Sequence, residues 1–341
     1  MGSLEQAVYA IIISFVIGVI LCPIVIPMLR KLKFGQNVRD DGPQTHLAKQ
    51  GTPTMGGVAF LAAFVITSLF FLNGNRDGAA IMLMTLCYGL IGFLDDYIKV
   101  VKKRSLGLRA YQKLLLQLIV TGLFCSYIMK SGIGTAIYIP FTDGKMIDLR
   151  LAGENGVAAY GVIMYAAFLF VAVLGTVNGV NLTDGLDGLA GGVTLLVAAF
   201  FMIVAWAAGS TIAPVCGAIV GGLMAFLIFN SYPAKVFMGD TGSLALGGFV
   251  ASAAFILKMP IFIVIVGFIY LWESISVMLQ VGWFKLTKRK YGEGRRLFKM
   301  APFHHHLEKC GWKETKVVTL FYVATALLCL IGFLGCKYMF L

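Results

Sequence analysis

The chain has 341 residues, of which 59% are hydrophobic and only 13% are charged, and its mean hydropathy is +0.87. A soluble domain carries about a quarter charged residues and could not bury this much apolar surface. The composition therefore excludes an ordinary soluble enzyme and predicts an all-α polytopic membrane protein. Because apolar runs recur along the whole sequence, we expect one integral membrane domain over residues 1–341.

About ten apolar segments are candidates for membrane-spanning helices. A helix needs about 20 apolar residues to cross the hydrocarbon core of a bilayer. Between the fourth and fifth candidates, the polar turn at 142–145 separates two β-prone runs, which predicts a small hairpin. In chain order the candidates are 6–29, 55–72, 79–94, 114–130, 158–177, 190–208, 212–230, 241–257, 260–284 and 317–339.

The basic residues are distributed unevenly between the two sets of loops. One set holds 22 of the 28 Lys and Arg residues, and the other set with its flanks holds 6. Cytoplasmic loops are enriched in Lys and Arg, so we expect the first set in the cytoplasm and both termini and the hairpin outside. The net charge of +12 is then mainly a topology signal, and nucleic-acid binding is not expected. The cytoplasmic set is 30–54, 95–113, 178–189, 231–240 and 285–316.

Acidic residues are scarce, yet they gather in the predicted cytoplasmic loops. Carboxylates near hydrocarbon are costly and usually functional. Carboxylates mixed with Lys and His suit a hard divalent cation together with anionic phosphates. The clusters are Asp40 with Asp41, Asp95 with Asp96, Asp184 with Asp187, and Asp240.

Each acidic cluster also has a plain structural interpretation. Asp95 and Asp96 close the third segment, where Lys99 could neutralise either one, or they could simply be solvated at a helix end. Asn181, Asp184 and Asp187 recur every three residues, which suits one helical face or a polar turn between segments. Asp240 precedes an apolar helix, so it could cap that helix as well as bind a metal.

Two basic segments could bind phosphate. Residues 301–308 contain His304, His305 and His306; consecutive histidines on one helix cannot all face one metal, which argues against a zinc site. Histidines titrate near neutral pH and can donate to phosphate oxygens. Residues 46–57 carry Lys49 and Thr54, which could hold phosphate or form a basic turn at the membrane surface.

Five segments carry motifs beyond single residues: GTPTMGG at 51–57, LDDYIKV at 94–100, NLTDGLDGLA at 181–190, VFMGDTGSLALGG at 236–248 and APFHHHLEKCGWKE at 301–314. Together they resemble the polyprenyl-phosphate N-acetylhexosamine-1-phosphate transferase superfamily, and within it most closely the phospho-N-acetylmuramoyl-pentapeptide transferases. The resemblance covers nearly the whole chain, and the histidine segment distinguishes this branch from related ones. The alternative is a branch that transfers N-acetylglucosamine-1-phosphate to a polyprenyl phosphate.

The resemblance implies a reaction and its partners. The substrates are expected to be UDP-N-acetylmuramoyl-pentapeptide and undecaprenyl phosphate, and the products lipid I and UMP, with Mg²⁺ as cofactor. The enzyme is expected in the bacterial cytoplasmic membrane with its active site facing the cytoplasm. The resemblance further implies a homodimer that nucleoside antibiotics inhibit.

Residue roles also follow from the motif match. Asp240 and Asp95 are expected to hold Mg²⁺, and Asp95, next to the essential Asp96, is the candidate base. The histidines His304, His305 and His306 are expected to be catalytic as well. Asn181, Asp187 and Phe237 are expected on the uridine side. The remaining expected substrate-binding residues are Lys49, Thr54, Lys99, Lys103, Lys113, Asp184 and Asn230.

Two alternatives concern mechanism and class. A phosphate monoester is mostly dianionic at neutral pH because its second pKa is near 6, so we favour direct attack by the lipid phosphate. A phosphorylated enzyme trapped with the UDP substrate alone would favour a covalent intermediate on an Asp instead. A secondary transporter would place charges at mid-bilayer and show internal repeats, whereas here only Glu273 lies well inside a segment.

Overall fold

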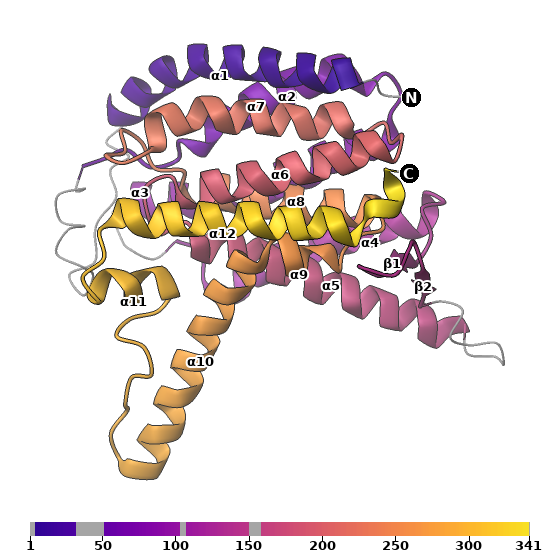
Figure 1. Ribbon diagram of the computed structural model, residues 1–341. Coiled ribbons are helices and arrows are strands. Elements are labelled where there is room, and N and C mark those ends of the chain that lie inside the picture. The colour runs from indigo at the N-terminus through magenta and orange to yellow at the C-terminus, as the bar shows by residue number, and fades with distance from the viewer. Residues whose placement is uncertain (1–3, 32–50, 103–106, 150–157, 341) are drawn as a thin grey trace.

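The computed structural model describes residues 4–31, 51–102, 107–149 and 158–340, and most of these residues are helical (Figure 1). The helices within these ranges are α1 (Leu4–Lys31), α2 (Gly57–Leu72), α3 (Arg76–Val101), α4 (Ala110–Lys130), α5 (Ala158–Thr183), α6 (Leu189–Ala207), α7 (Ala213–Asn230), α8 (Gly239–Ile256), α9 (Phe262–Val266), α10 (Phe268–Tyr291), α11 (Phe303–Lys309) and α12 (Glu314–Gly335). A short 3₁₀ turn, Lys337–Met339, follows α12.

The long helices form a bundle. In the part of the chain that the structure describes, eight helices are long and apolar enough to cross a membrane, namely α1, α3, α4, α5, α6, α7, α8 and α12. The apolar helix α2 is shorter. Nine of the ten predicted segments therefore correspond to one helix each, which confirms the all-α polytopic prediction.

The ninth predicted segment, 260–284, differs from the prediction because it is not one continuous span. It is divided at Gly267 into α9 and α10, and α10 leaves the side of the bundle (Figure 1). A Cβ at Gly267 would lie 2.7 Å from the carbonyl oxygen of Ile263, so the tight bend needs glycine. The start of α10 buries Glu273 completely, which removes a carboxylate from contact with lipid.

Close approach of helix backbones depends on glycine, as the α1–α7 and α3–α8 interfaces show. Between α1 and α7, a Cβ at Gly221 would lie 2.1 Å from the carbonyl oxygen of Ile11. Between α3 and α8, a Cβ at Gly92 would lie 2.0 Å from the carbonyl oxygen of Asp240. Small residues allow such contact where lipid supplies no hydrophobic force between helices. The second contact brings the end of α3 beside the start of α8.

The predicted hairpin is confirmed. Strands β1 (Ala136–Tyr138) and β2 (Met146–Asp148) are antiparallel, with Ile137 opposite Ile147. The backbone N–H of Phe141 donates to Gly335 at 3.0 Å, which attaches the hairpin to the end of α12. Both chain ends and the hairpin lie at one end of the bundle, and α11 lies at the other (Figure 1).

The α1–α7 contact can be tested by adding one methyl group. We expect Gly221→Ala to lower the stability by about 1–3 kcal/mol, because the new Cβ overlaps the backbone of α1. Gly175→Ala is the matched control, since no atom lies within 4 Å of its added Cβ and alanine favours helix. Thermal unfolding in detergent measures both variants, and equal unfolding temperatures would contradict the interpretation.

Candidate active site

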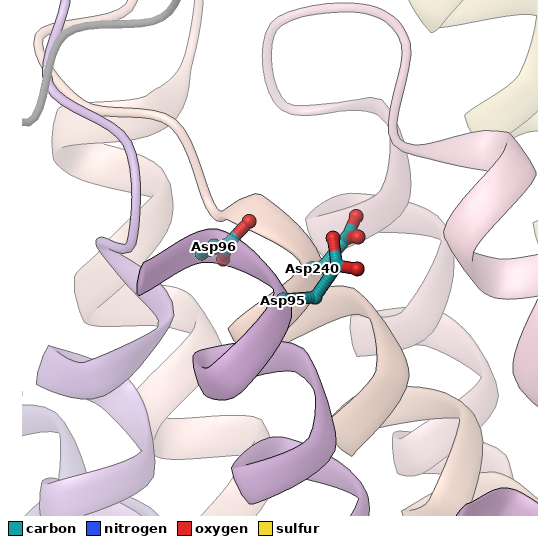
Figure 2. Close-up of side chains that lie close together, drawn as sticks. All are labelled: Asp95, Asp96 and Asp240. Carbon is teal, nitrogen blue, oxygen red and sulfur yellow. The ribbon is translucent and has the colours of Figure 1, made fainter. Parts of the chain in front are cut away.

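Three carboxylates meet at the end of the bundle opposite the chain termini. Asp95 and Asp96 lie near the end of α3, and Asp240 lies in the first turn of α8. One oxygen of each lies within 4.8 Å of the others. Figure 2 shows the carboxylates of Asp95 and Asp240 side by side, with Asp96 on the other side of the same turn of α3. Residues 145 positions apart in the sequence thus form one cluster.

Asp240 is held from three helices. Its Oδ1 accepts a hydrogen bond from Nδ2 of Asn181 in α5 at 2.8 Å. Its Oδ2 accepts from Nζ of Lys99 in α3 at 2.9 Å and from Nζ of Lys113 in α4 at 3.0 Å. The carboxylate orientation is therefore fixed on both oxygens, and two ammonium groups balance its charge.

Lys99 is shared among all three carboxylates. Besides Asp240, its Nζ lies 2.6 Å from Oδ2 of Asp95 and 3.7 Å from Oδ1 of Asp96. Both carboxylates are almost fully buried, with 3% of each residue exposed. The predicted pairing of Lys99 with either aspartate is confirmed, and the ammonium marks a position where the site favours positive charge.

Asp95 and Asp96 point in different directions because adjacent residues on a helix are about 100° apart. Oδ2 of Asp96 accepts hydrogen bonds from both the backbone N–H and Oγ1 of Thr241, at 2.9 and 2.8 Å. Asp96, from the neighbouring helix α3, thus accepts from a backbone N–H at the amino end of α8 that has no partner within its own helix. Oδ1 of Asp95 accepts from the backbone N–H of Leu108 at 2.8 Å, which brings the segment before α4 to the site.

The first predicted phosphate-binding segment lies beside the Asp240 motif. The backbone N–H of Gly56 donates to Phe237 and that of Phe237 donates to Pro53, both at 2.8 Å. A Cβ at Gly239, whose φ is +73°, would lie 2.9 Å from Oγ1 of Thr54. The backbone bonds thus pair the segment before α2 with the segment before α8, and the side chain of Thr54 lies near Gly239, next to Asp240. Lys49 lies outside the described residues, as does Lys103.

Asp184 follows α5 and lies in an electrostatically crowded position. Burial, together with the nearby carboxylates of Asp240, Asp96 and Asp187, raises the pKa of Asp184 to about 8. Its carboxyl group therefore holds a proton at neutral pH when no cation is bound. Of the predicted triplet, Asn181 reaches the cluster directly, and Asp184 interacts with it through charge.

Asp187 and Asn230 join loops in this structure. Oδ2 of Asp187 accepts from the backbone N–H of Ala234 at 2.9 Å, and its own N–H donates to Oε1 of Glu314 at 2.7 Å. Nδ2 of Asn230 donates to the carbonyl of Val236 at 2.9 Å. These bonds shape the loop that carries Phe237, so the roles expected for Asp187 and Asn230 at the substrate remain predictions.

The three histidines of α11 have different surroundings. His304 is fully buried, and its Nδ1 lies 3.0 Å from Oε2 of Glu273. Its Nε2 faces Gly185, where a Cβ would lie only 2.1 Å away. Nδ1 of His305 lies 2.8 Å from Oε2 of Glu308. Contact with Gly185 joins α11 to the loop that follows Asp184.

Nδ1 of His306 accepts a hydrogen bond from the backbone N–H of Lys299 at 3.1 Å. The structure thus places each ring in a separate environment, as their adjacency in sequence requires. Sequence reasoning missed the contribution of Glu273, which it noted only as an ionisable residue inside a span. It also missed Thr241, which directly follows Asp240, and Ser243, whose Oγ accepts a hydrogen bond from Nδ2 of Asn181 at 2.8 Å.

The cluster fits a hard divalent cation. Carboxylate oxygens are the ligands such ions prefer, and buried carboxylates this close together repel unless a cation lies among them. The Lys99 ammonium provides part of that compensation. Asp240 and Asp95 offer oxygens toward each other (Figure 2), and Asp96 has Oδ1 remaining beside Lys99.

Comparison with known proteins identifies relatives that are all transferases. Residues 78–258, more than half of the chain, match the glycosyl transferase family 4 model, and residues 49–61 match signature 1 of the phospho-N-acetylmuramoyl-pentapeptide-transferases. A phospho-N-acetylmuramoyl-pentapeptide-transferase of Clostridium perfringens strain 13 is 49% identical over 330 residues, which cover 96% of this chain and 98% of the relative.

Two further relatives with the same name are similarly close. The Clostridium kluyveri protein (strain ATCC 8527) is 48% identical over 97% of this chain and 99% of its own length. The Caldicellulosiruptor bescii protein is 49% identical over 96% of each chain. The similarity thus extends over nearly the full length of both partners and is not confined to the motifs.

The raised pKa of Asp184 predicts a pH-dependent stability. The folded state binds this proton more tightly than the unfolded chain, so the free energy of unfolding should fall as the pH rises from about 4 through 8. Asp184→Asn carries no such proton. In buffer with EDTA, its unfolding temperature relative to the unsubstituted protein should therefore be higher at about pH 9 than at about pH 4. A difference independent of pH would contradict the raised pKa.

Proposed function

Because the chain belongs to the phospho-N-acetylmuramoyl-pentapeptide-transferase family, we propose that it transfers phospho-N-acetylmuramoyl-pentapeptide from its UDP derivative to undecaprenyl phosphate, forming lipid I and releasing UMP. The observation that carries the proposal is the meeting of three carboxylates and two lysines at one end of a membrane bundle. The names of the relatives favour this donor over UDP-N-acetylglucosamine, and they favour a transferase over a transporter.

Charge neutralisation is the main task of such a site. Both reacting groups are anionic phosphates, so their mutual repulsion opposes attack, and preorganised positive charge lowers that barrier. Lys99 and Lys113 converge on the same oxygen of Asp240. Their ammonium groups can pair with phosphate oxygens when the carboxylate charge is neutralised in another way. Thr54 lies close enough to the same cluster to add a hydroxyl donor.

Mg²⁺ is the cation that we propose for the carboxylates, with Asp240 and Asp95 as its ligands. When bound, Mg²⁺ would supply positive charge that offsets the negative charge of the diphosphate and of the departing UMP. Asp96 contributes indirectly, because its bonds to Thr241 hold the amino end of α8, and therefore Asp240, in position.

A general base adds little to this reaction. A lipid phosphate with a second pKa near 6 is already mostly dianionic at neutral pH. We therefore propose direct attack, with Asp95 binding the cation and orienting Lys99 instead of removing a proton. The salt bridge between Lys99 and Asp95 is consistent with that role.

The histidine segment and the uridine side complete the proposed site. His305 and His306 of α11 are half-buried and are proposed to face the sugar and phosphate, whereas the buried His304 anchors α11. Phe237, on the loop that Asp187 shapes, is proposed to lie against uridine, where nucleoside antibiotics would compete. We also propose that the enzyme acts as a homodimer.

The cytoplasmic orientation is part of the proposal. The basic loops favour the cytoplasm for the end that carries the carboxylates. A site at the edge of the bilayer would hold the lipid phosphate at a fixed depth, so that it meets the diphosphate of the other substrate already oriented for attack.

Removing the carboxylate of Asp240 tests the proposed function. With both substrates and Mg²⁺ in detergent, we expect Asp240→Asn to reduce UMP release by at least about 100-fold, because charge stabilisation at the reacting phosphates is lost. Asp143→Asn is the matched control, since that side chain is 80% exposed at the hairpin, at the opposite end of the bundle. Activity of Asp240→Asn within about tenfold of the unsubstituted protein would overturn the proposed role, and absence of UMP release by the unsubstituted protein would overturn the function.

The orientation can be tested with a native cysteine. Cys310 follows α11 and is exposed, whereas the other six cysteines are buried or half-buried. A membrane-impermeant maleimide should therefore label the protein in inside-out vesicles but not in intact spheroplasts. Cys310→Ser should abolish the labelling. Labelling of Cys310 in intact spheroplasts would reverse the orientation.

A further inference from the structure

Uncharged polar side chains on three helices form two hydrogen-bonded pairs behind the carboxylates. The carbonyl of Gln117 joins the pairs, because it accepts from the hydroxyls of Tyr88 at 3.3 Å and Thr121 at 2.7 Å. Nδ2 of Asn178 in α5 donates to Oε1 of Gln117 in α4 at 3.0 Å, and Nε2 of Gln117 donates back to Oδ1 of Asn178 at 3.4 Å. The hydroxyl of Tyr88 in α3 lies 2.7 Å from Oγ1 of Thr121 in α4. These four residues are called the polar belt below.

Three residues of the polar belt are buried within membrane-spanning helices, and the fourth, Asn178, is half-buried. Tyr88 and Thr121 are fully buried, and Gln117 is 1% exposed. A buried polar group without a partner is costly, so reciprocal bonds between helices fix their relative position. The two amides bond to each other from different helices, so neither could keep this bond if α4 and α5 moved apart or rotated.

The belt residues share helix faces with the residues that contact the site. Gln117 lies four residues after Lys113 on α4, which is about 6 Å along the helix axis. Asn178 lies three residues before Asn181 on α5. Side chains three or four positions apart project from the same face. The amide pair is therefore one turn behind the two side chains that reach Asp240.

Those two side chains hold opposite oxygens of one carboxylate. Lys113 contacts Oδ2 of Asp240, and Asn181 contacts Oδ1. The separation and rotation of α4 and α5 thus decide whether both contacts form at once. We propose that Gln117 and Asn178 are positioning residues that set the orientation of the Asp240 carboxylate for a divalent cation. The inference rests on the proposed function of Asp240 as a metal ligand.

Two other polar residues on the same helices bond only within their own helix. The hydroxyl of Thr176 in α5 donates to the carbonyl of Ala172, and that of Ser126 in α4 donates to the carbonyl of Gly122. Both bonds lie within one helix, four residues apart, so they carry no information about helix separation. Thr176 and Ser126 therefore provide matched controls.

The experiment measures Mn²⁺ binding and catalysis separately. Mn²⁺ replaces Mg²⁺ as a probe because its binding to the full-length protein in detergent is read directly by electron paramagnetic resonance. The variants are Gln117→Leu, Asn178→Leu, the milder Gln117→Asn, and the exchange Gln117→Asn with Asn178→Gln. Each is also assayed for kcat and for KM of the UDP substrate. The controls are Thr176→Val and Ser126→Ala.

We expect the single belt variants to weaken Mn²⁺ binding and lower kcat by about fivefold or more, in the range of coupling between neighbouring residues. KM should change less than kcat. The exchange variant keeps the number of methylene groups between α4 and α5, so it should recover most of the loss seen with Gln117→Asn alone. The two controls should match the unsubstituted protein.

Two results would overturn the inference. One is that Asn178→Leu binds Mn²⁺ as tightly as the unsubstituted protein. The other is that the exchange variant binds Mn²⁺ no more tightly than Gln117→Asn alone. The second comparison tests the inference even if the leucine variants fail to fold. Failure of the proposed function gives a different pattern, because the unsubstituted protein and Asp240→Asn would then bind Mn²⁺ equally.

Discussion

The structure depends on holding three like-charged carboxylates together at one end of a bundle of membrane helices. Asp95, Asp96 and Asp240 repel one another in a poorly solvated place, and Lys99 and Lys113 provide the compensation. Under the proposed function, a metal ion would replace these ammonium groups at the carboxylates, and their charges would turn toward phosphate. The same electrostatic demand that makes the cluster costly thus supports the proposed reaction between two anions.

Backbone proximity makes this arrangement possible. The glycine at position 92 lets α3 touch α8, so that Asp96 can cap the amino end of the helix that carries Asp240. Helix geometry then gives the two adjacent aspartates different contacts. Asp95 pairs with the Lys99 ammonium, and Asp96 accepts from the backbone of α8. The site is rigid on one side, since its acidic residues sit on packed helices and not on free loops.

The histidine segment is attached to the same end by a buried pair. Glu273 enters the bundle at the bend between α9 and α10, and His304 meets it there. An intramembrane carboxylate normally needs such a partner. Because His304 is anchored in this way, the remaining histidines of α11 are presented from a fixed helix beside the loop that follows Asp184.

The sequence determined the membrane class, nine of the ten spans, the hairpin and the acidic motifs, because hydropathy, turn chemistry and residue type act over short stretches of chain. It also indicated that Lys99 pairs with Asp95 and Asp96, which are one helical turn away. It did not reveal the bend at Gly267, because the apolar run continues through the glycine. Only the tertiary structure decided that Asp240 is held by Lys113 and Asn181, that Gln117 pairs with Asn178, and that His304 faces Glu273. Each of these contacts joins different helices, and the spacing and rotation of packed helices are set by side-chain packing that no local pattern encodes.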